Sequence, residues 1–241
     1  MATARILVPA LFVGLAALGV PGVSLADGMT PESSIVILPT DAKSTSIKVT
    51  NTSATDDLLL VEILPIDEDT EDVALVQPGM GEALVKAGKE QQVTFTLLDE
   101  ARASKVQRLR RVVFEGAKGR PKRAKQHNEV GVTVRQNLPL IVHPKGLELV
   151  RDPWTNLKWT RSGGNITVSN DSPYVVRLAQ EILVLPSNTQ LGLQESYVLP
   201  AKRLTMQLPA AAANDKQVRI FPATVYGFAT DHFDAPLTES H

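Results

Sequence analysis

The stretch that decides the fold runs from Glu129 to His143 and reads EVGVTVRQNLPLIVH. Its even positions are apolar apart from Gln136, namely Val130, Val132, Val134, Leu138, Leu140 and Val142. A period of two places these side chains on one face of a β-strand. Strands usually have about four to eight residues. This segment is therefore long enough to cross one domain and to extend past its boundary, where the apolar face would need a partner.

The rest of the chain also reads as short strands separated by turns. Apolar or alternating runs recur about every 10–15 residues, which is close to the spacing in an antiparallel β-sandwich. Helix is favoured only at Asp99–Arg108, for one or two turns. We therefore predict an all-β fold. The expected further strands are Ser33–Leu38, Ser44–Asn51, Leu58–Ile66, Val93–Leu97, Leu109–Glu115, Leu157–Trp159, Ile166–Val168, Val175–Leu185, Val198–Pro200, Leu204–Leu208, Val218–Phe221 and Thr224–Phe228.

The turn Pro144-Lys145-Gly146 follows the long strand and divides the predicted strands into two sets. Each set suits one sandwich, since an immunoglobulin-like domain has about 100 residues. We expect two immunoglobulin-like β-sandwich domains, residues 27–145 and 146–241, after a signal peptide at residues 1–26. A single large jelly roll is the alternative that the spacing leaves open.

The N-terminus has the features of a cleaved secretory signal. Arg5 supplies the positive start, Leu7–Val23 is apolar, and Ser24-Leu25-Ala26 has the small residues that precede a cleavage site. We expect cleavage before Asp27 and export to the periplasm. No later segment approaches the roughly 20 apolar residues that span a bilayer, so stable membrane insertion is not expected. The sequence has no cysteine, which excludes a disulfide scaffold and lipidation.

Charge is nearly balanced along the chain, with a formal net charge of −1. The basic loop Lys118–Lys125 has no aromatic residue on which a base could stack, so nucleic acid is not an expected partner. We interpret the loop as a connection between strands that could also steer an acidic partner.

The acidic run Asp67–Asp72 lacks the glycine and the spacing of a calcium loop and is expected to be a solvated hairpin tip.

Sequence patterns for catalysis are missing. The four histidines do not pair at metal-ligand spacing, and neither a Gly-x-Ser-x-Gly elbow nor a phosphate loop occurs. We therefore expect no catalytic residue, no metal, no cofactor and no enzyme activity.

The long strand needs one of two explanations for its apolar face. The face could pack wholly against its own domain, as we expect for Leu140 and Val142. However, Val130, Val132 and Val134 lie beside the basic loop, and a bare apolar edge invites aggregation unless another chain pairs with it. We therefore assign a partner-binding surface to Val130, Val132, Val134 and Leu138, although Leu138 is also expected to face the core. A second copy of the chain could cap the same edge in a self-capping oligomer.

The sequence resembles PapD-like periplasmic pilus-assembly chaperones over nearly all of residues 29–230. The resemblance rests on Ser46–Asn51 with its closing asparagine, on Arg111–Glu115, on the alternating segment that ends at Pro144, and on the turn Asn170-Asp171-Ser172-Pro173-Tyr174. It implies two sandwiches arranged in an L. It also implies that the seventh strand, about residues 129–142, is lent to a pilin (fimbrial) subunit that lacks a strand, so that Val130, Val132 and Val134 fill its groove. The capped subunit would then pass to an outer-membrane usher.

The sequence departs from this family where the subunit's C-terminal carboxylate is bound. The family uses an arginine on the first strand and a lysine late on the seventh, and these positions fall on Ile35 and Pro139 here, which suggests a divergent branch. The candidates for a replacement charge are Arg110, Arg111 and Arg135. By alternation Arg135 points to the face opposite the valines. His143 also stands where the family often has an arginine in its interdomain charge network.

Two other classes of exported protein were weighed. A structural or adhesive component of a surface fibre would begin with alternating apolar residues, whereas Asp27–Ser33 is mostly polar. A periplasmic carbohydrate-binding or hydrolytic enzyme would need clustered aromatic residues or paired carboxylates. Trp154 and Trp159 are the only tryptophans, and we expect both to pack at the start of the second domain.

Overall fold

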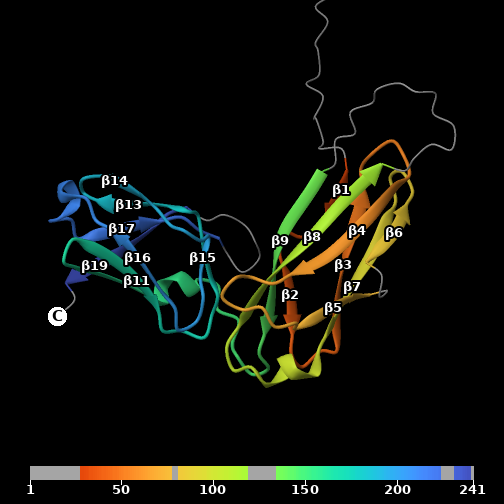
Figure 1. Ribbon diagram of the computed structural model, residues 1–241, viewed down its shortest axis with the longest axis horizontal. Coiled ribbons are helices and arrows are strands. Elements are labelled where there is room, and N and C mark those ends of the chain that lie inside the picture. The colour runs from red at the N-terminus through yellow and green to blue at the C-terminus, as the bar shows by residue number, and fades with distance from the viewer. Residues whose placement is uncertain (1–27, 78–80, 119–133, 224–230, 240–241) are drawn as a thin grey trace, which may run out of the picture.

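The computed structural model describes residues 28–77, 81–118, 134–223 and 231–239. Within these ranges the chain forms strands and three short 3₁₀ segments, η1 (Asp99–Ala103), η2 (Pro153–Asn156) and η3 (Ala210–Ala212). The strands build two sandwich lobes that join at an angle in an L (Figure 1). The predicted all-β fold with two sandwich domains is therefore confirmed. Among the described residues, no helix has the length and apolar character that crossing a membrane requires.

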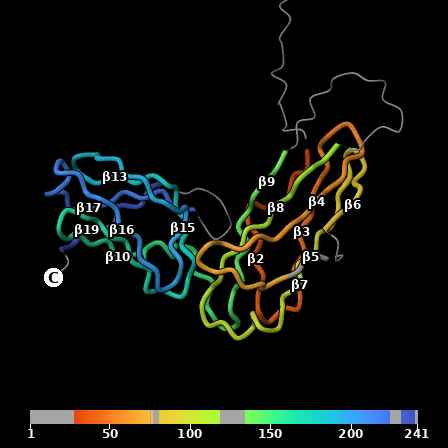
Figure 2. Tube along the Cα trace, viewed as in Figure 1, coloured from red at the N-terminus to blue at the C-terminus, as the bar shows by residue number. Residues whose placement is uncertain are grey.

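The N-terminal domain packs a five-stranded sheet against a four-stranded one. The first sheet has the order β2-β9-β8-β4-β6. Its strands are β2 (Val36–Pro39), β9 (Val134–His143), β8 (Arg108–Lys118), β4 (Asp57–Leu64) and β6 (Glu82–Val85). The second sheet has the order β1-β3-β7-β5. Its strands are β1 (Met29–Pro31), β3 (Ser44–Asn51), β7 (Glu90–Leu97) and β5 (Ala74–Gln77). The two layers can be followed along the chain trace in Figure 2.

The C-terminal domain has a seven-stranded and a three-stranded sheet. The larger sheet has the order β14-β13-β17-β19-β10-β11-β16, and the smaller has β15-β12-β18. The strands of the larger sheet are β10 (Leu157–Ser162), β11 (Asn165–Asn170), β13 (Glu181–Leu185), β14 (Thr189–Gly192), β16 (Arg203–Gln207), β17 (Gln217–Ile220) and β19 (Phe233–Glu239). Those of the smaller are β12 (Val176–Leu178), β15 (Tyr197–Val198) and β18 (Pro222–Ala223).

Alternate strand residues fill one hydrophobic core in each domain. In the N-terminal core, Phe95 of β7 and Phe114 of β8 meet edge to face across the two sheets, with ring centroids 6.4 Å apart. In the C-terminal core, Trp154 and Trp159 pack with the aliphatic side chains of both sheets, as the sequence predicted. Aromatic residues contribute much of the buried apolar area in such cores.

The same asparagine turn closes a strand in each domain. Asn51 ends β3, Asn170 ends β11, and both are fully buried. Each side-chain amide donates to a backbone oxygen four residues ahead and to a second oxygen on another strand, Val85 and Val198 respectively, at 2.7–2.9 Å. Each Oδ1 accepts from the backbone N–H of the serine two residues ahead. Because the buried amide is fully hydrogen-bonded, it fixes the path of the turn.

Differences from the predicted strands have local causes. Ser44–Asn51 is β3 as predicted, whereas the helical segment is a 3₁₀ helix that ends at Ala103. The predicted first strand is interrupted because Ser33 Oγ accepts from the N–H of Ile35 at 3.2 Å and donates to its carbonyl oxygen at 2.7 Å. This turn moves the chain from β1 in one sheet to β2 in the other. The strand expected at 224–228 lies outside the described residues.

Candidate functional site: an open strand edge beside the interdomain cleft

β9 has a strand on both sides over only part of its length. It pairs with β8 in register from Val134 to Val142. On the other side β2 lies parallel and covers only Leu140–His143. Residues 134–139 therefore have an open edge within the described part of the chain, and Figure 1 shows this part of β9 at the margin of its sheet. An open edge presents backbone N–H and C=O groups to any chain that can add a strand.

The core-facing side chains of β9 become more exposed toward the N-terminal end of the strand. Leu138 is 7% exposed and belongs to the core of its own domain, whereas Gln136 and Val134 are half-buried. Leu138 therefore packs in its own sandwich, which confirms the expectation that it faces the core. Val130 and Val132 lie outside the described residues.

The N-terminal segment lies against the open end of β9. Gln136 Nε2 donates to the backbone oxygen of Met29 at 2.9 Å. A Cβ added to Gly28 would lie 3.3 Å from Cβ of Val134, so this glycine packs on the valine. Val134 and Gln136 thus point to the core-facing side of the sheet, where they contact the N-terminal segment.

An apolar cluster fills the cleft between the two domains. Its buried members are Ile35, Ile66, Leu109, Ile141, Val175 and Tyr197, with Ile37 and Leu199 packed against them. Ile35 is 5% exposed. The position where the family resemblance places an arginine is therefore an apolar contact between domains, and an unpaired charge there would be costly to bury.

Gln107 links the two domains through two hydrogen bonds, and a third joins it to His143 of its own domain. Its backbone N–H donates to Pro173 O at 2.8 Å, and its Oε1 accepts from the N–H of Val175 at 2.9 Å. Its Nε2 donates to Nδ1 of His143 at 2.9 Å, so the other ring nitrogen of His143 donates to Leu147 O, also at 2.9 Å. His143 is thus part of a hydrogen-bond network at the domain junction. The sequence pattern gave no signal for Gln107.

Arg110 is not available to a partner, contrary to the prediction. It is 1% exposed and donates to Asp69 Oδ1 at 2.7 Å and to Leu109 O at 2.6 Å. Arg108 binds the same carboxylate through Nε and Nη2, at 2.7 and 2.5 Å. Burial alone would raise the pKa of Asp69, but the hydrogen bonds from both arginines outweigh it and hold that pKa well below its usual range. Asp69, in the acidic run predicted to be solvated, is therefore a structural anchor for β8.

Arg111 projects into the cleft. It lies opposite Pro139 in the β8–β9 ladder. Its Nη2 donates to Ser196 Oγ at 3.3 Å, and its guanidinium carbon lies 5.8 Å from the centroid of the Tyr197 ring. No carboxylate forms an ion pair with Arg111 among the described residues. Burial, followed by a hydrogen bond to Glu68, raises the pKa of Tyr197, so this phenol stays neutral.

Arg135 lies on the solvent face of β9, as alternation predicted. Its side chain is 54% exposed and is 4.0 Å from Glu62 and 3.9 Å from Glu115. Such loose exposed pairs contribute little to stability. Of the three candidate arginines, Arg111 is the one that the structure places in the cleft.

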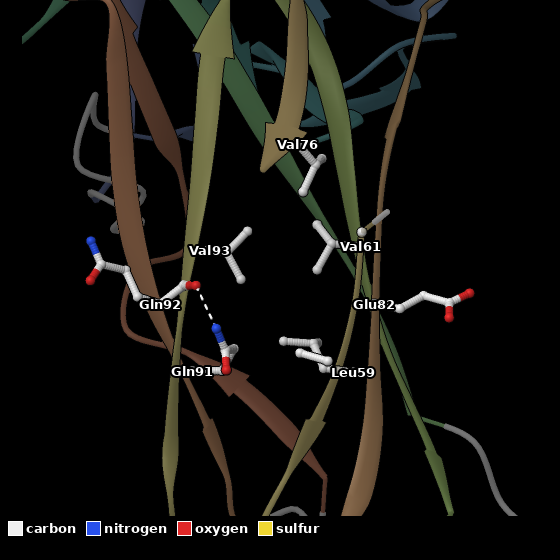
Figure 3. Close-up of a pocket in the computed structure, with 9 residues that line it drawn as sticks. Leu59, Val61, Val76, Glu82, Gln91, Gln92 and Val93 are labelled. Atoms are coloured by element: carbon white, nitrogen blue, oxygen red, sulfur yellow. Dashed lines mark hydrogen bonds between the residues drawn. The ribbon is translucent and has the colours of Figure 1, made fainter. Parts of the chain in front are cut away.

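Two of the cavities formed by described residues border the N-terminal domain. One of about 400 Å³ lies between the domains and is lined by Glu68, Gln107 and Lys202 among others. The other, about 10 Å³, lies between β4 and β7 at the margin away from β9 (Figure 3). There Gln91 donates to Gln92 O at 2.9 Å, and the space holds at most about one water molecule. No group of three or more potential metal ligands occurs in the described ranges.

The described chain combines two joined β-sandwiches of immunoglobulin-like class with an open strand edge next to their cleft. The family model for the pili and flagellar-assembly chaperone PapD N-terminal domain matches residues 28–148. The model for the pili assembly chaperone PapD C-terminal domain matches residues 152–233. The chain belongs to the PapD family of pilus-assembly chaperones, and the resemblance drawn from the sequence is confirmed.

Relatives support the same assignment. The chain is 34% identical over 214 residues to the uncharacterized fimbrial chaperone YhcA of Escherichia coli (strain K12), covering 89% of this chain and 92% of the relative. The structure of the SafB chaperone in complex with the SafA pilin of Salmonella enterica has a TM-score of 0.71 at 16% identity, covering 89% of this chain and 98% of the other. The E. coli chaperone DraB has a TM-score of 0.67 at 18% identity, with coverage of 87% and 98%. These two structures show the shared fold.

Proposed function

We propose that this protein is a periplasmic chaperone that captures fimbrial subunits by lending them the open edge of β9. The observation that carries the proposal is the strand edge at residues 134–139, which pairs with β8 on one side and has no registered neighbour on the other within the described chain. A subunit strand added there would extend the five-stranded sheet. Each backbone hydrogen bond formed would contribute about 0.5–1.5 kcal/mol.

The alternating valines would give this pairing its side-chain component. Val134 is half-buried on the core-facing side of β9. The alternation of the sequence would place Val130 and Val132 on the same face as Val134, so that all three valines would enter one groove of the subunit. Full burial of each valine contributes about 1.5–3 kcal/mol, part of which is offset by the cost of ordering both chains.

Arg111 is the residue we propose for an electrostatic contact with the subunit, in place of the charges missing at Ile35 and Pro139. It lies in the cleft beside the end of the open edge and has no ion-pair partner among the described residues. Burial and the bond to Asp69 disfavour Arg110 for this role. Arg135 faces solvent near two glutamates, which disfavours it.

The cellular setting of this activity is also part of the proposal. The signal peptide at residues 1–26 would be cleaved on export to the periplasm. The boundary between the two domains would lie near residue 145, between the end of β9 at His143 and the start of η2 at Pro153.

Release of the captured subunit would occur at an outer-membrane usher, when another subunit's segment replaces β9. Such an exchange of strands requires neither catalysis nor a cofactor. The alternative role, a structural component of the fibre, is disfavoured by the family assignment.

A co-expression pull-down with a fimbrial subunit tests the strand-lending step. Val134→Asp places a charge on the core-facing side of the open edge and should reduce subunit recovery at least tenfold. Asn137→Asp is the matched control, because Asn137 is exposed on the opposite face of the same strand, and it should leave recovery within about twofold. Circular dichroism checks that both variants are folded. Equal recovery with both variants would refute strand lending through β9.

A further inference from the structure

Pro139 is a buried proline in the interior of β9, opposite Arg111 in the ladder with β8. A proline has no backbone N–H and therefore removes one hydrogen bond from a sheet. Inside a strand it is tolerated where the missing donor would face an open edge, or at a bulge. The β8–β9 register has no bulge at this point. The missing donor of Pro139 must therefore face the edge of β9 that lies away from β8.

The backbone groups of the odd residues of β9 point to that edge. Thr40 N–H donates to His143 O at 2.8 Å, which places this carbonyl group on the side of β2. Backbone N–H and C=O pairs alternate between the two sides of a strand. Arg135 and Asn137 therefore present both a donor and an acceptor on the open edge, whereas Pro139 presents an acceptor alone.

The missing donor marks the boundary between the covered and the open part of the edge. β2 pairs with β9 from Leu140 onward, and the next ladder bond would need the N–H of residue 139. The chain before β2 instead folds into a turn, in which Ser33 Oγ accepts from the N–H of Ile35 at 3.2 Å and donates to its carbonyl oxygen at 2.7 Å. Pro139 thus ends the pairing with β2 without leaving a donor unpaired.

The open section beyond Pro139 already has strand geometry before a partner arrives. Its pairing with β8 continues to Val134. On the core-facing side, Gln136 Nε2 donates to Met29 O at 2.9 Å, and Gly28 packs on Val134. A strand that pairs with this edge therefore meets a preorganised row of donors and acceptors, which lowers the ordering cost of pairing.

We propose that Pro139 is a register stop, which limits the strand that a captured subunit adds to β9 and so fixes its alignment. A carbonyl group of the added strand placed against residue 139 finds no donor, and burying it without a partner is unfavourable. Registered pairing therefore ends at Asn137, and the added strand cannot slide along the edge toward β2. This role rests on the proposed strand lending and names the residue that sets its extent. It also limits the number of hydrogen bonds that must break when the subunit is released.

Backbone hydrogen exchange, in the free protein and in the complex with a co-expressed fimbrial subunit, tests the stop. In the unsubstituted protein the amides of Arg135 and Asn137 should slow by at least tenfold in the complex. Pro139→Ala restores the donor, and its new amide should exchange rapidly in the free variant, because β2 stops at the next residue. In the complex this amide should also slow by at least tenfold, because the added strand can now pair one step further.

The strength of capture gives a second measurement on the same variants. One additional hydrogen bond should make the complex of Pro139→Ala about two- to tenfold tighter. Pro139→Val supplies the same donor with a side chain that suits a buried strand position, so the test does not depend on the folding of one variant. Pro39→Ala is the matched control, because it removes the proline at the end of β2, away from the open edge, and it should change neither exchange at Arg135 and Asn137 nor capture.

The outcomes separate the stop from strand lending itself. If Arg135 and Asn137 exchange equally fast in the free protein and in the complex, strand lending fails and the stop fails with it. The stop alone is overturned if these two amides are protected but the new amide at residue 139 exchanges at the same rate with and without the subunit. It is also overturned if Arg135 is protected without Asn137, or if restoring the donor leaves capture no tighter than in Pro39→Ala.

Discussion

Replacing Asp69 by asparagine should destabilise the N-terminal domain, because two arginines of β8 share its carboxylate. The side chains of Arg110 and Arg108 are 2% and 17% exposed, so neither charge can be well solvated if the carboxylate is lost. Removing one partner of a buried ion pair costs about 3–5 kcal/mol. Arg108 keeps a contact with Glu71 at 3.1 Å, so we expect a loss near the lower limit, about 3 kcal/mol. This is a large part of the roughly 5–15 kcal/mol that stabilises a typical domain.

Urea unfolding can assign this loss to one domain. Both tryptophans lie in the C-terminal core, so their fluorescence reports that domain, while far-UV circular dichroism reports both. Asp69→Asn should lower the midpoint seen by circular dichroism more than the midpoint seen by fluorescence. Asp171→Asn is the matched control, because both Asp171 and its partner Lys158 are exposed, and it should leave both urea midpoints nearly unchanged. A cost for Asp69→Asn that equals the control would refute the argument.

The same ion pair predicts how the difference depends on pH. The folded-state pKa of Asp69 lies below its usual value, which is about 3.9 in an unfolded chain. A carboxyl group with a lowered folded pKa stabilises the protein above that unfolded value, and the contribution is lost as the pH falls. The stability difference between the protein and Asp69→Asn should be constant at pH 5–8 and should shrink below about pH 4. A difference that grows on acidification would contradict the assignment.

Three further substitutions test the hinge and the turns. Gln107→Ala removes the side-chain bonds to Val175 and His143 and should widen the distribution of interdomain angles in small-angle scattering, whereas an unchanged profile would count against its linking role. Asn51→Ala removes the amide's hydrogen bonds to Thr55 O and to the buried Val85 O and should cost about 1–3 kcal/mol in thermal unfolding. An unchanged melting temperature would show that the turn does not need the amide. Gly81→Ala should destabilise the protein more than Gly88→Ala does. Both glycines have positive φ, but only a Cβ at Gly81 would lie 2.4 Å from a backbone oxygen. Equal melting temperatures of the two variants would refute this difference.

Much of the site could be predicted because alternation is a local property. The period of two along β9 indicated which side chains share a face, and Arg135 lies on the solvent side as expected. The same reasoning, applied to β8, would have separated Arg110 from Arg111. Val112 and Phe114 are core residues, so Arg110 shares their inward face and Arg111 points to the cleft.

Other features depend on contacts between distant parts of the chain. Alternation does not reveal that β2 covers β9 only from Leu140 onward, which is what opens the edge. Nor does it reveal that Gln107 meets the C-terminal domain. β19 was missed because Pro236 argues against a central strand, yet Phe233–Glu239 lies between β17 and β10. Long-range pairing outweighs the weak local preference there.

Hydrogen exchange at the backbone amides of residues 135–138 tests the central claim most directly. In the free protein the amides that point away from β8 should exchange rapidly, while those of Leu140 and Val142, enclosed between β8 and β2, should exchange slowly. On capture of a fimbrial subunit, the rapid amides should slow by at least tenfold. Rates that stay the same in the complex would contradict the account, because no strand would then have been added to β9.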